Sequence, residues 1–154
     1  MRLAIAALFA GLAVSPAFAQ EDEHVFTFGP ITIEHPWARA AAAGADTLAF
    51  VEILNDGLAD RVVGFSTEIA TSVELVGLTI QNGLIEMVPV PDFDLPPGAF
   101  TFDPNGLGIA LRGLTEPLVE GTEFELTMTL QNAGEMTFHV LVQAPDAVAH
   151  EHAH

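Results

Sequence analysis

The chain has 154 residues, 21 of them acidic and four basic, which gives a formal net charge of −17, and it contains no cysteine. Without cysteine, a thiol nucleophile, a thiolate metal site and a redox dithiol are excluded, and stability must come from packing and hydrogen bonds. The acidic excess repels nucleic acid and anionic lipid and attracts cations or basic partners, although such a surface also suits solubility in a salty environment.

The first 19 residues predict a secretory signal peptide. Arg2 gives a positive start, residues 3–14 form an apolar run, and Ala17 and Ala19 place small side chains at both cleavage-determining positions. The run spans about a dozen residues, whereas a helix needs roughly 20 to cross a bilayer. We therefore expect cleavage after Ala19 and a soluble periplasmic protein without stable membrane insertion. Removal of Arg2 leaves three arginines against 21 acidic residues, a net charge of −18.

A polar leader over residues 20–28 runs into the first of a series of predicted short strands. These are runs rich in Val, Ile, Phe and Thr, at residues 25–34, 48–54, 61–67, 72–76, 107–112, 123–130 and 135–143. The clearest is the run 123–130, because Phe124, Leu126, Met128 and Leu130 alternate there with Glu and Thr. This alternation is typical of a strand that buries one face.

Turn signals separate these strands. Asn82-Gly83 lies between two apolar runs, and this pair of residues is the one best able to adopt the positive φ angles of a tight hairpin. A second turn is predicted at residues 131–134, and prolines punctuate residues 89–104. No segment after the signal peptide has convincing helical periodicity. Many short strands in about 135 residues predict a single all-β domain, a two-sheet sandwich.

Several segments, taken together and in this order, resemble the periplasmic copper chaperones of the PCu(A)C family. They are Ile33-Glu34-His35-Pro36-Trp37-Ala38-Arg39, Asn55-Asp56-Gly57, residues 59–64, Val73-Glu74-Leu75, Met87-Val88-Pro89-Val90, residues 111–114 and residues 117–121. The resemblance implies a cupredoxin-like, immunoglobulin-like β-sandwich of Greek-key type over residues 29–144. It also implies copper(I) binding and delivery to the copper-centre subunit of a respiratory oxidase or to another copper carrier.

Most of the copper ligands that the resemblance implies are absent. In the family, copper is held by a His directly after the Val-Glu-Leu segment, a Met at the end of the following hairpin, and a later His-x-Met. These positions fall on Val76, Met87, Gly108 and Ala110, or, if the alignment shifts by one residue, on Ile109 and Leu111 for the last two. Met87 is the one donor that remains. A single thioether is a weak copper site, so Met87 either contributes weakly or packs as an ordinary apolar side chain.

Histidines near the C-terminus are the other candidate metal ligands. Residues 145–154 carry few large apolar side chains, so we expect a flexible tail. His150, His152 and His154 are spaced two apart in this tail, and His-rich tracts commonly bind copper(II) or zinc. The alternative is a solvated tail with incidental histidines.

The remaining histidines and carboxylates give no catalytic signature. His24 stands fifth in the mature chain, whereas an amino-terminal copper(II) motif needs a His at the third position. We interpret His35 as shaping the start of its strand, with metal ligation as the less favoured alternative, and His139 as facing solvent. The sequence has no Gly-rich phosphate loop, no Gly-x-Ser-x-Gly elbow and no His-Glu-x-x-His helix, so we do not expect an enzyme.

Two functions remain open from the sequence. The leading hypothesis is a periplasmic copper-binding accessory protein, related to chaperones for oxidase copper centres, with the family site largely lost. Copper or zinc would then be held by the tail histidines and by Met87. The alternative is a metal-free β-sandwich that keeps the fold and serves as a binding or interaction module. A basic partner that docks on the acidic surface would associate in a strongly salt-dependent way.

Overall fold

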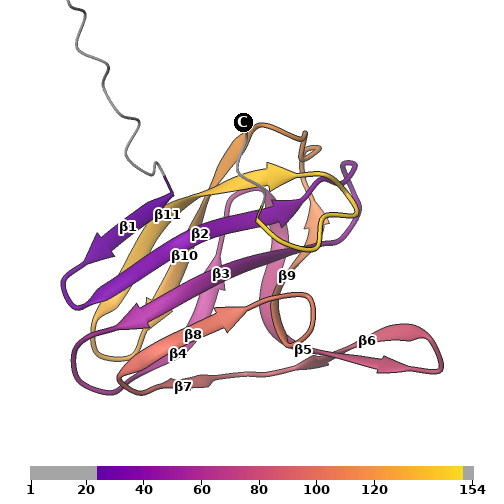
Figure 1. The fold of residues 1–154 in the computed structure, drawn as a ribbon. Coiled ribbons are helices and arrows are strands. Elements are labelled where there is room, and N and C mark those ends of the chain that lie inside the picture. The colour runs from indigo at the N-terminus through magenta and orange to yellow at the C-terminus, as the bar shows by residue number, and fades with distance from the viewer. Residues whose placement is uncertain (1–23, 151–154) are drawn as a thin grey trace, which may run out of the picture.

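The structure of the protein is a computed structural model that describes residues 24–150. These residues form β-strands, turns and loops without a helix, so none of them belongs to a membrane-spanning helix (Figure 1). The strands are β1 (Val25–Phe28), β2 (Ile31–Arg39), β3 (Thr47–Asn55), β4 (Asp60–Ser66), β5 (Ala70–Gln81), β6 (Leu84–Pro89), β7 (Phe93–Leu95), β8 (Gly98–Phe102), β9 (Leu107–Leu114), β10 (Glu123–Leu130) and β11 (Gly134–Gln143). The predicted signal peptide lies outside the described residues, as do His152 and His154.

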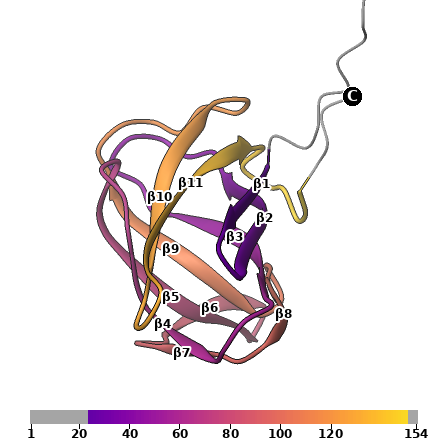
Figure 2. The same cartoon turned by 90° about the vertical axis from the view of Figure 1, so that its left-hand side faces the viewer.

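The strands form one hydrogen-bonded path that curls around a common core (Figure 1, Figure 2). Its order is β6-β5-β9-β3-β2-β11-β10-β4-β7, with β1 beside β2 and β8 beside β3. Neighbouring strands are antiparallel except for β2 and β11, which run parallel. Gln143 at the end of β11 is paired with Arg39 at the end of β2. The chain that follows β11 therefore starts beside the C-terminal end of β2.

The main core lies between the two layers of this path. Alternate residues of β2, β3 and β9 share one buried cluster with alternate residues of β10 and β11, as expected for strands that each bury one face. Ile33, Ile53 and Ile109 come from the first layer, and Leu126 and Phe138 from the second; none is more than 1% exposed. The all-β sandwich predicted from the sequence is therefore confirmed.

Most predicted strands are confirmed, and the differences are local. The hairpin between β5 and β6 turns at Asn82 and Gly83, whose φ angles are 53° and 76°. The first predicted run is two strands, because Gly29 (φ 59°) and Pro30 turn the chain between β1 and β2. Strands β7 and β8 were not predicted, since they lie among the prolines of residues 89–104, and proline weakens any strand prediction.

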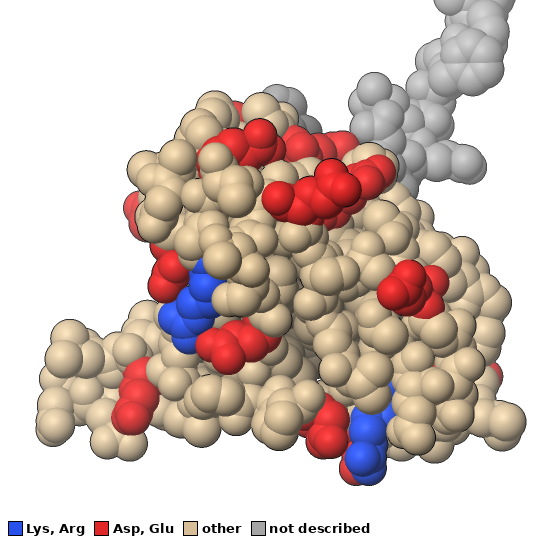
Figure 3. All heavy atoms as spheres, turned by 180° about the vertical axis from the view of Figure 1, so that it is seen from behind, with Lys and Arg blue, Asp and Glu red and all other residues tan. Residues whose placement is uncertain are grey.

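Acidic side chains are spread over the surface, as Figure 3 shows for one face of the molecule. Two of the arginines bind carboxylates: Arg61 contacts Asp94 at 2.9 Å and Arg112 contacts Glu74 at 2.7 Å. With four basic residues against 21 acidic ones, most carboxylates have no basic side chain to pair with.

Candidate metal centre

The positions implied by the family resemblance lie together on one face of β6, β5 and β9. Val76 on β5 is the direct partner of Gly108 on β9, and Ala110 lies two residues further along β9, hence on the same face. Met87 on β6 is the partner of Leu78, which lies two residues from Val76 on β5. The four positions therefore share a face when the alignment uses Gly108 and Ala110.

The alignment shifted by one residue does not give such a face. The side chains of Ile109 and Leu111 belong to the main core on the opposite side of β9, and both are 0% exposed. The geometry therefore favours Gly108 and Ala110 as the positions that correspond to the family's His-x-Met.

Apolar side chains cover this face. They form what we call the outer cluster: Trp37, Leu48, Phe50, Val76, Ala110 and Ala147, with Leu78, Met87 and Ala144 packed against it. Val76 is 0% exposed, and the ring centroids of Trp37 and Phe50 lie 4.7 Å apart. A Cβ added at Gly108 would lie 3.2 Å from the Phe50 ring. The face offers one thioether and little room, which does not fit a copper ion that needs several donors.

The structure does not bring the predicted ligands Met87 and His150 together. Met87 is half-buried on β6 and packs against the outer cluster. Met87 and His150 line two different cavities. The other two tail histidines lie outside the described residues. Within residues 24–150, His150 is thus the one predicted tail ligand that the structure places.

Residues 144–150, which we call the C-terminal segment, pack against the sheet. Ala147 is 7% exposed, and its carbonyl accepts a 2.9 Å hydrogen bond from Nε of Arg39. The Arg39 guanidinium also lies 5.7 Å from the centroid of the Phe50 ring, a cation–π distance. We expected a flexible tail because residues 145–154 have few large apolar side chains. That expectation does not account for the packing of the small side chain of Ala147.

A β-bulge in β2 places His35 next to the start of β1. The register between β2 and β3 shifts after Glu34, so that His35 and Pro36 together stand opposite one residue of β3. His35 has a φ of 48°, a left-handed conformation that is uncommon for a residue other than glycine. Its N–H donates a 2.8 Å hydrogen bond to the carbonyl of His24. Bulges of this kind redirect side chains and are frequent next to functional sites.

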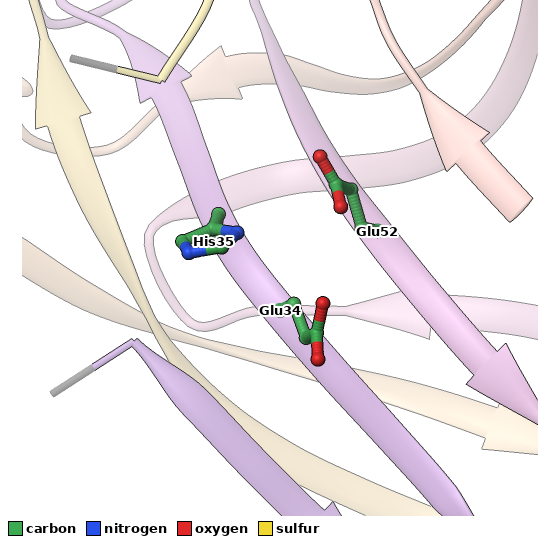
Figure 4. Close-up of side chains that lie close together, drawn as sticks. All are labelled: Glu34, His35 and Glu52. Atoms are coloured by element: carbon green, nitrogen blue, oxygen red, sulfur yellow. The ribbon is translucent and has the colours of Figure 1, made fainter. Parts of the chain in front are cut away.

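Side chains that can bind a metal gather at this bulge (Figure 4). Potential ligand atoms of Glu34, His35 and Glu52 lie within 4.8 Å of one another, with the two glutamates directly opposite on β2 and β3. The ring of His150 lies near two further rings: its centroid is 5.2 Å from that of His35 and 5.5 Å from that of His24. The cluster therefore combines residues from both ends of the described chain.

A cavity of about 230 Å³ adjoins the cluster, and its walls include His35, Trp37, Glu52, Asp103 and His150. Pockets for drug-sized ligands span roughly 300–1,000 Å³. Besides apolar side chains such as Val51 and Phe102, the walls carry imidazole and carboxylate groups, which are the groups that can coordinate a cation.

Sequence reasoning missed the ligand potential of His24 and ranked a structural role for His35 above metal ligation. The signal that was available is Pro36 directly after His35 inside a predicted strand, because proline within a strand often marks a bulge. No sequence signal indicated that His24 would pair with this bulge, since that contact depends on the register of β1 against β2.

The fold is that of a copper-chaperone-type domain. The apo PCuAC domain of PmoF2 is similar at 28% sequence identity and a TM-score of 0.66, over 81% of this chain and 98% of that one. The apo PCuAC domain of PmoF1 is similar at 30% identity and a TM-score of 0.65, over 79% of this chain and 100% of that one. A copper-bound PCuAC domain of PmoF2 has a TM-score of 0.66 at 27% identity, over 79% and 99% of the two chains.

The sequence profile of the LpqE-like lipoprotein family matches residues 31–142. The chain belongs to this LpqE-like family, and the resemblance to PCu(A)C copper chaperones is confirmed. Apo-DR1885 from Deinococcus radiodurans is also similar, at 25% identity and a TM-score of 0.55, over 94% of this chain and 97% of that one. No curated protein matches the chain significantly.

Proposed function

We propose that this protein is an exported copper-binding accessory protein in which the metal is held away from the family's copper position. The observation that carries the proposal is the similarity to PCuAC domains, one of which, from PmoF2, was solved with copper bound. A copper-related role fits this family, and we propose that the role is copper handling without catalysis.

Two features of the structure support a displaced metal site. The face that contains Val76, Gly108 and Ala110 carries Met87 as its one donor and is covered by apolar side chains. By contrast, His150 lies at a different part of the sheet, within 5.5 Å of two other imidazole rings. A protein that lost the donors on the face of Val76 but kept metal binding would need other ligands, such as the imidazoles around His150.

The cellular context follows from the signal peptide predicted from the sequence. Export to the periplasm would place the protein where copper is loaded into respiratory enzymes. The partner in this proposal is a copper-centre subunit of a respiratory oxidase or another copper carrier. The acidic surface repels anionic lipid, so the exchange with a partner is proposed to occur between water-exposed protein surfaces.

Titration of the chain from Gln20 with copper(I) and, separately, with copper(II) tests this function, in competition with a chelator of known affinity. A version that ends at Pro145 lacks the three tail histidines, but it also loses the packing of Ala147. A second version therefore keeps the full length and replaces the three tail histidines with Asn. We expect copper binding in the parent chain and a large loss in both versions.

The outcomes separate the alternatives. Equal binding in all three proteins would mean that the domain holds copper without the tail histidines and that the site is not displaced to them. Absence of binding of either copper ion to the parent chain would contradict the metal-binding function itself.

A metal-free interaction module is the second candidate, and one observation favours it. The β5–β6 hairpin extends away from the sandwich (Figure 1), and four large apolar side chains on it are exposed: Ile80 (77%), Leu84 (74%), Ile85 (57%) and Val88 (47%). Grouped exposed apolar side chains mark interaction surfaces in soluble proteins. This function predicts no copper binding in any version of the chain.

A further inference from the structure

Three histidines from three separate segments meet at the bulge of β2. His24 precedes β1, His35 lies in the bulge, and His150 ends the described part of the C-terminal segment. A backbone hydrogen bond of 2.8 Å joins the first two, and the ring of His150 lies close to both of their rings. Met87 belongs to the outer cluster instead, so this group is distinct from the family's copper position.

The spacing of the rings matches that of imidazoles that share one metal ion. With metal–nitrogen bonds of about 2.0–2.1 Å and tetrahedral angles, the centroids of two such rings lie about 5 Å apart. The observed separations from the His150 ring are 5.2 and 5.5 Å. The rings are inclined at 48° and 62°, so they are not stacked face to face.

The environment of His24 also supports a ligand role. Its Nδ1 is buried and has no hydrogen-bond partner within residues 24–150. The Oε1 atom of Glu123 lies 4.0 Å away, which is beyond hydrogen-bond length. A buried nitrogen without a hydrogen bond costs free energy. A metal ion bound to this nitrogen would remove that cost.

Two carboxylates next to His35 supply the negative charge that a divalent ion needs. Glu34 and Glu52 are directly opposite on adjacent strands, and like charges in this arrangement repel each other. Within the described part of the chain, the ion pairs of Arg61 and Arg112 engage other carboxylates. A cation bound between the two glutamates would relieve their repulsion.

We propose that His24, His35 and His150 bind one divalent copper or zinc ion, with a carboxylate oxygen of Glu34 or Glu52 as a fourth ligand. Imidazole and carboxylate suit Cu²⁺ and Zn²⁺, whereas the copper(I) site of the family includes thioethers. The inference rests on the proposed metal-binding function and specifies its ligands and the class of ion. Because the ligands come from both ends of the domain, the ion also fixes the C-terminal segment to the start of β1.

Replacement of single histidines by Asn tests this site, since Asn removes the imidazole and tolerates the positive φ of His35. The variants are His24→Asn, His35→Asn and His150→Asn. The matched control is His139→Asn, which changes an exposed histidine on β11. Each chain, starting at Gln20, is titrated with Cu²⁺ and with Zn²⁺ against a competing chelator, and its unfolding temperature is measured with and without the ion.

We expect one ion per chain in the parent and in the control, and at least about tenfold weaker binding in each site variant. The scale follows from the 10–100-fold losses that changes even in the outer shell of metal sites cause. The ion should raise the unfolding temperature of the parent and the control more than that of the site variants. Glu52→Gln, on an exposed position of β3, should also weaken binding and provides a second test if a histidine variant does not fold.

The double variant His152→Asn with His154→Asn separates this site from the rest of the tail, and we expect it to retain the affinity of the parent. Should it lose the ion while His24→Asn and His35→Asn keep it, the three-histidine site is refuted, and the proposed function stands through the tail. Binding of copper(I) alone would also refute the divalent site without touching the proposed function. A parent chain that binds no copper or zinc ion would refute both.

Discussion

Restoring donors at the family's copper position should create a copper(I) site at a cost in stability. The variant combines Val76→His with Ala110→Met, which together with Met87 puts one imidazole and two thioethers on one face of β5, β6 and β9. Gly108 stays unchanged, because a Cβ there would lie 3.2–3.4 Å from three side chains, one of them Phe50.

The expected cost follows from the burial of the two sites. Val76 is 0% exposed and Ala110 is 1% exposed, within the packed outer cluster. Larger side chains in a packed site cost about 1–3 kcal/mol, and a buried polar group without a partner costs about 1–3 kcal/mol more. The apo variant should therefore be roughly 2–6 kcal/mol less stable than the parent, which is a large part of the roughly 5–15 kcal/mol by which typical domains are stable. Copper(I) at 100 times its Kd should restore about 2.7 kcal/mol.

Urea unfolding with and without copper(I), under reducing conditions, measures both effects. The control variant carries Val76→Leu with Ala110→Met, which adds comparable volume but no imidazole. It should lose stability from overpacking and gain less from copper(I). If the donor variant is as stable as the parent without metal, the outer cluster is not packed as the structure shows. If it folds but gains nothing from copper(I), positions 76, 87 and 110 do not form one site.

Three further predictions concern stability. Partial burial disfavours the charge on Asp60, but backbone N–H groups that donate to its carboxylate outweigh this effect and lower its pKa. The stabilising contribution of Asp60 is therefore present above the unfolded pKa near 4 and is lost as the pH falls through the lower folded value. Asp60→Asn should flatten the acid side of a plot of unfolding free energy against pH. Gly113→Ala should cost roughly 1–3 kcal/mol in urea unfolding, because Gly113 has a φ of 60° and an added Cβ would lie 2.8 Å from Oγ1 of Thr71. Leu84→Ser and Ile85→Ser should each change the unfolding free energy by no more than about 0.5 kcal/mol, since both side chains are exposed; a larger loss would show that the hairpin is packed.

The fold was largely predictable because its signals are local. The alternation in β10 needs no knowledge of the partner strand, and Asn82-Gly83 fixes its hairpin through the φ angles that these two residues tolerate. Strands β7 and β8 escaped prediction for the opposite reason. Their pairing with β4 and β3 depends on tertiary contacts, while their own sequence is dominated by turn-forming residues.

The candidate site could not be predicted in the same way. His35 and His150 are far apart in the sequence, and they meet because β11 runs parallel to β2 and delivers the C-terminal segment to its end. The bulge that redirects His35 depends on the register between β2 and β3. The sequence indicated His150 as a ligand from the number and spacing of the tail histidines, but its neighbours follow from topology.

The C-terminal segment connects the two parts of the sheet face on which both sites lie. Ala147 belongs to the outer cluster that fills the family's copper position, and three residues later His150 reaches the bulge of β2. The boundary between the apolar half and the acidic half of this sheet face lies between Phe50 and Glu52. These two residues are two apart on β3 and hence on one face. A copper ion at the family position would need this face open, whereas a divalent ion at the bulge needs the segment closed over it. In the proposed arrangement the metal ion holds the C-terminal segment over this face, so a substitution that displaces Ala147 should weaken metal binding at His150 without changing any ligand.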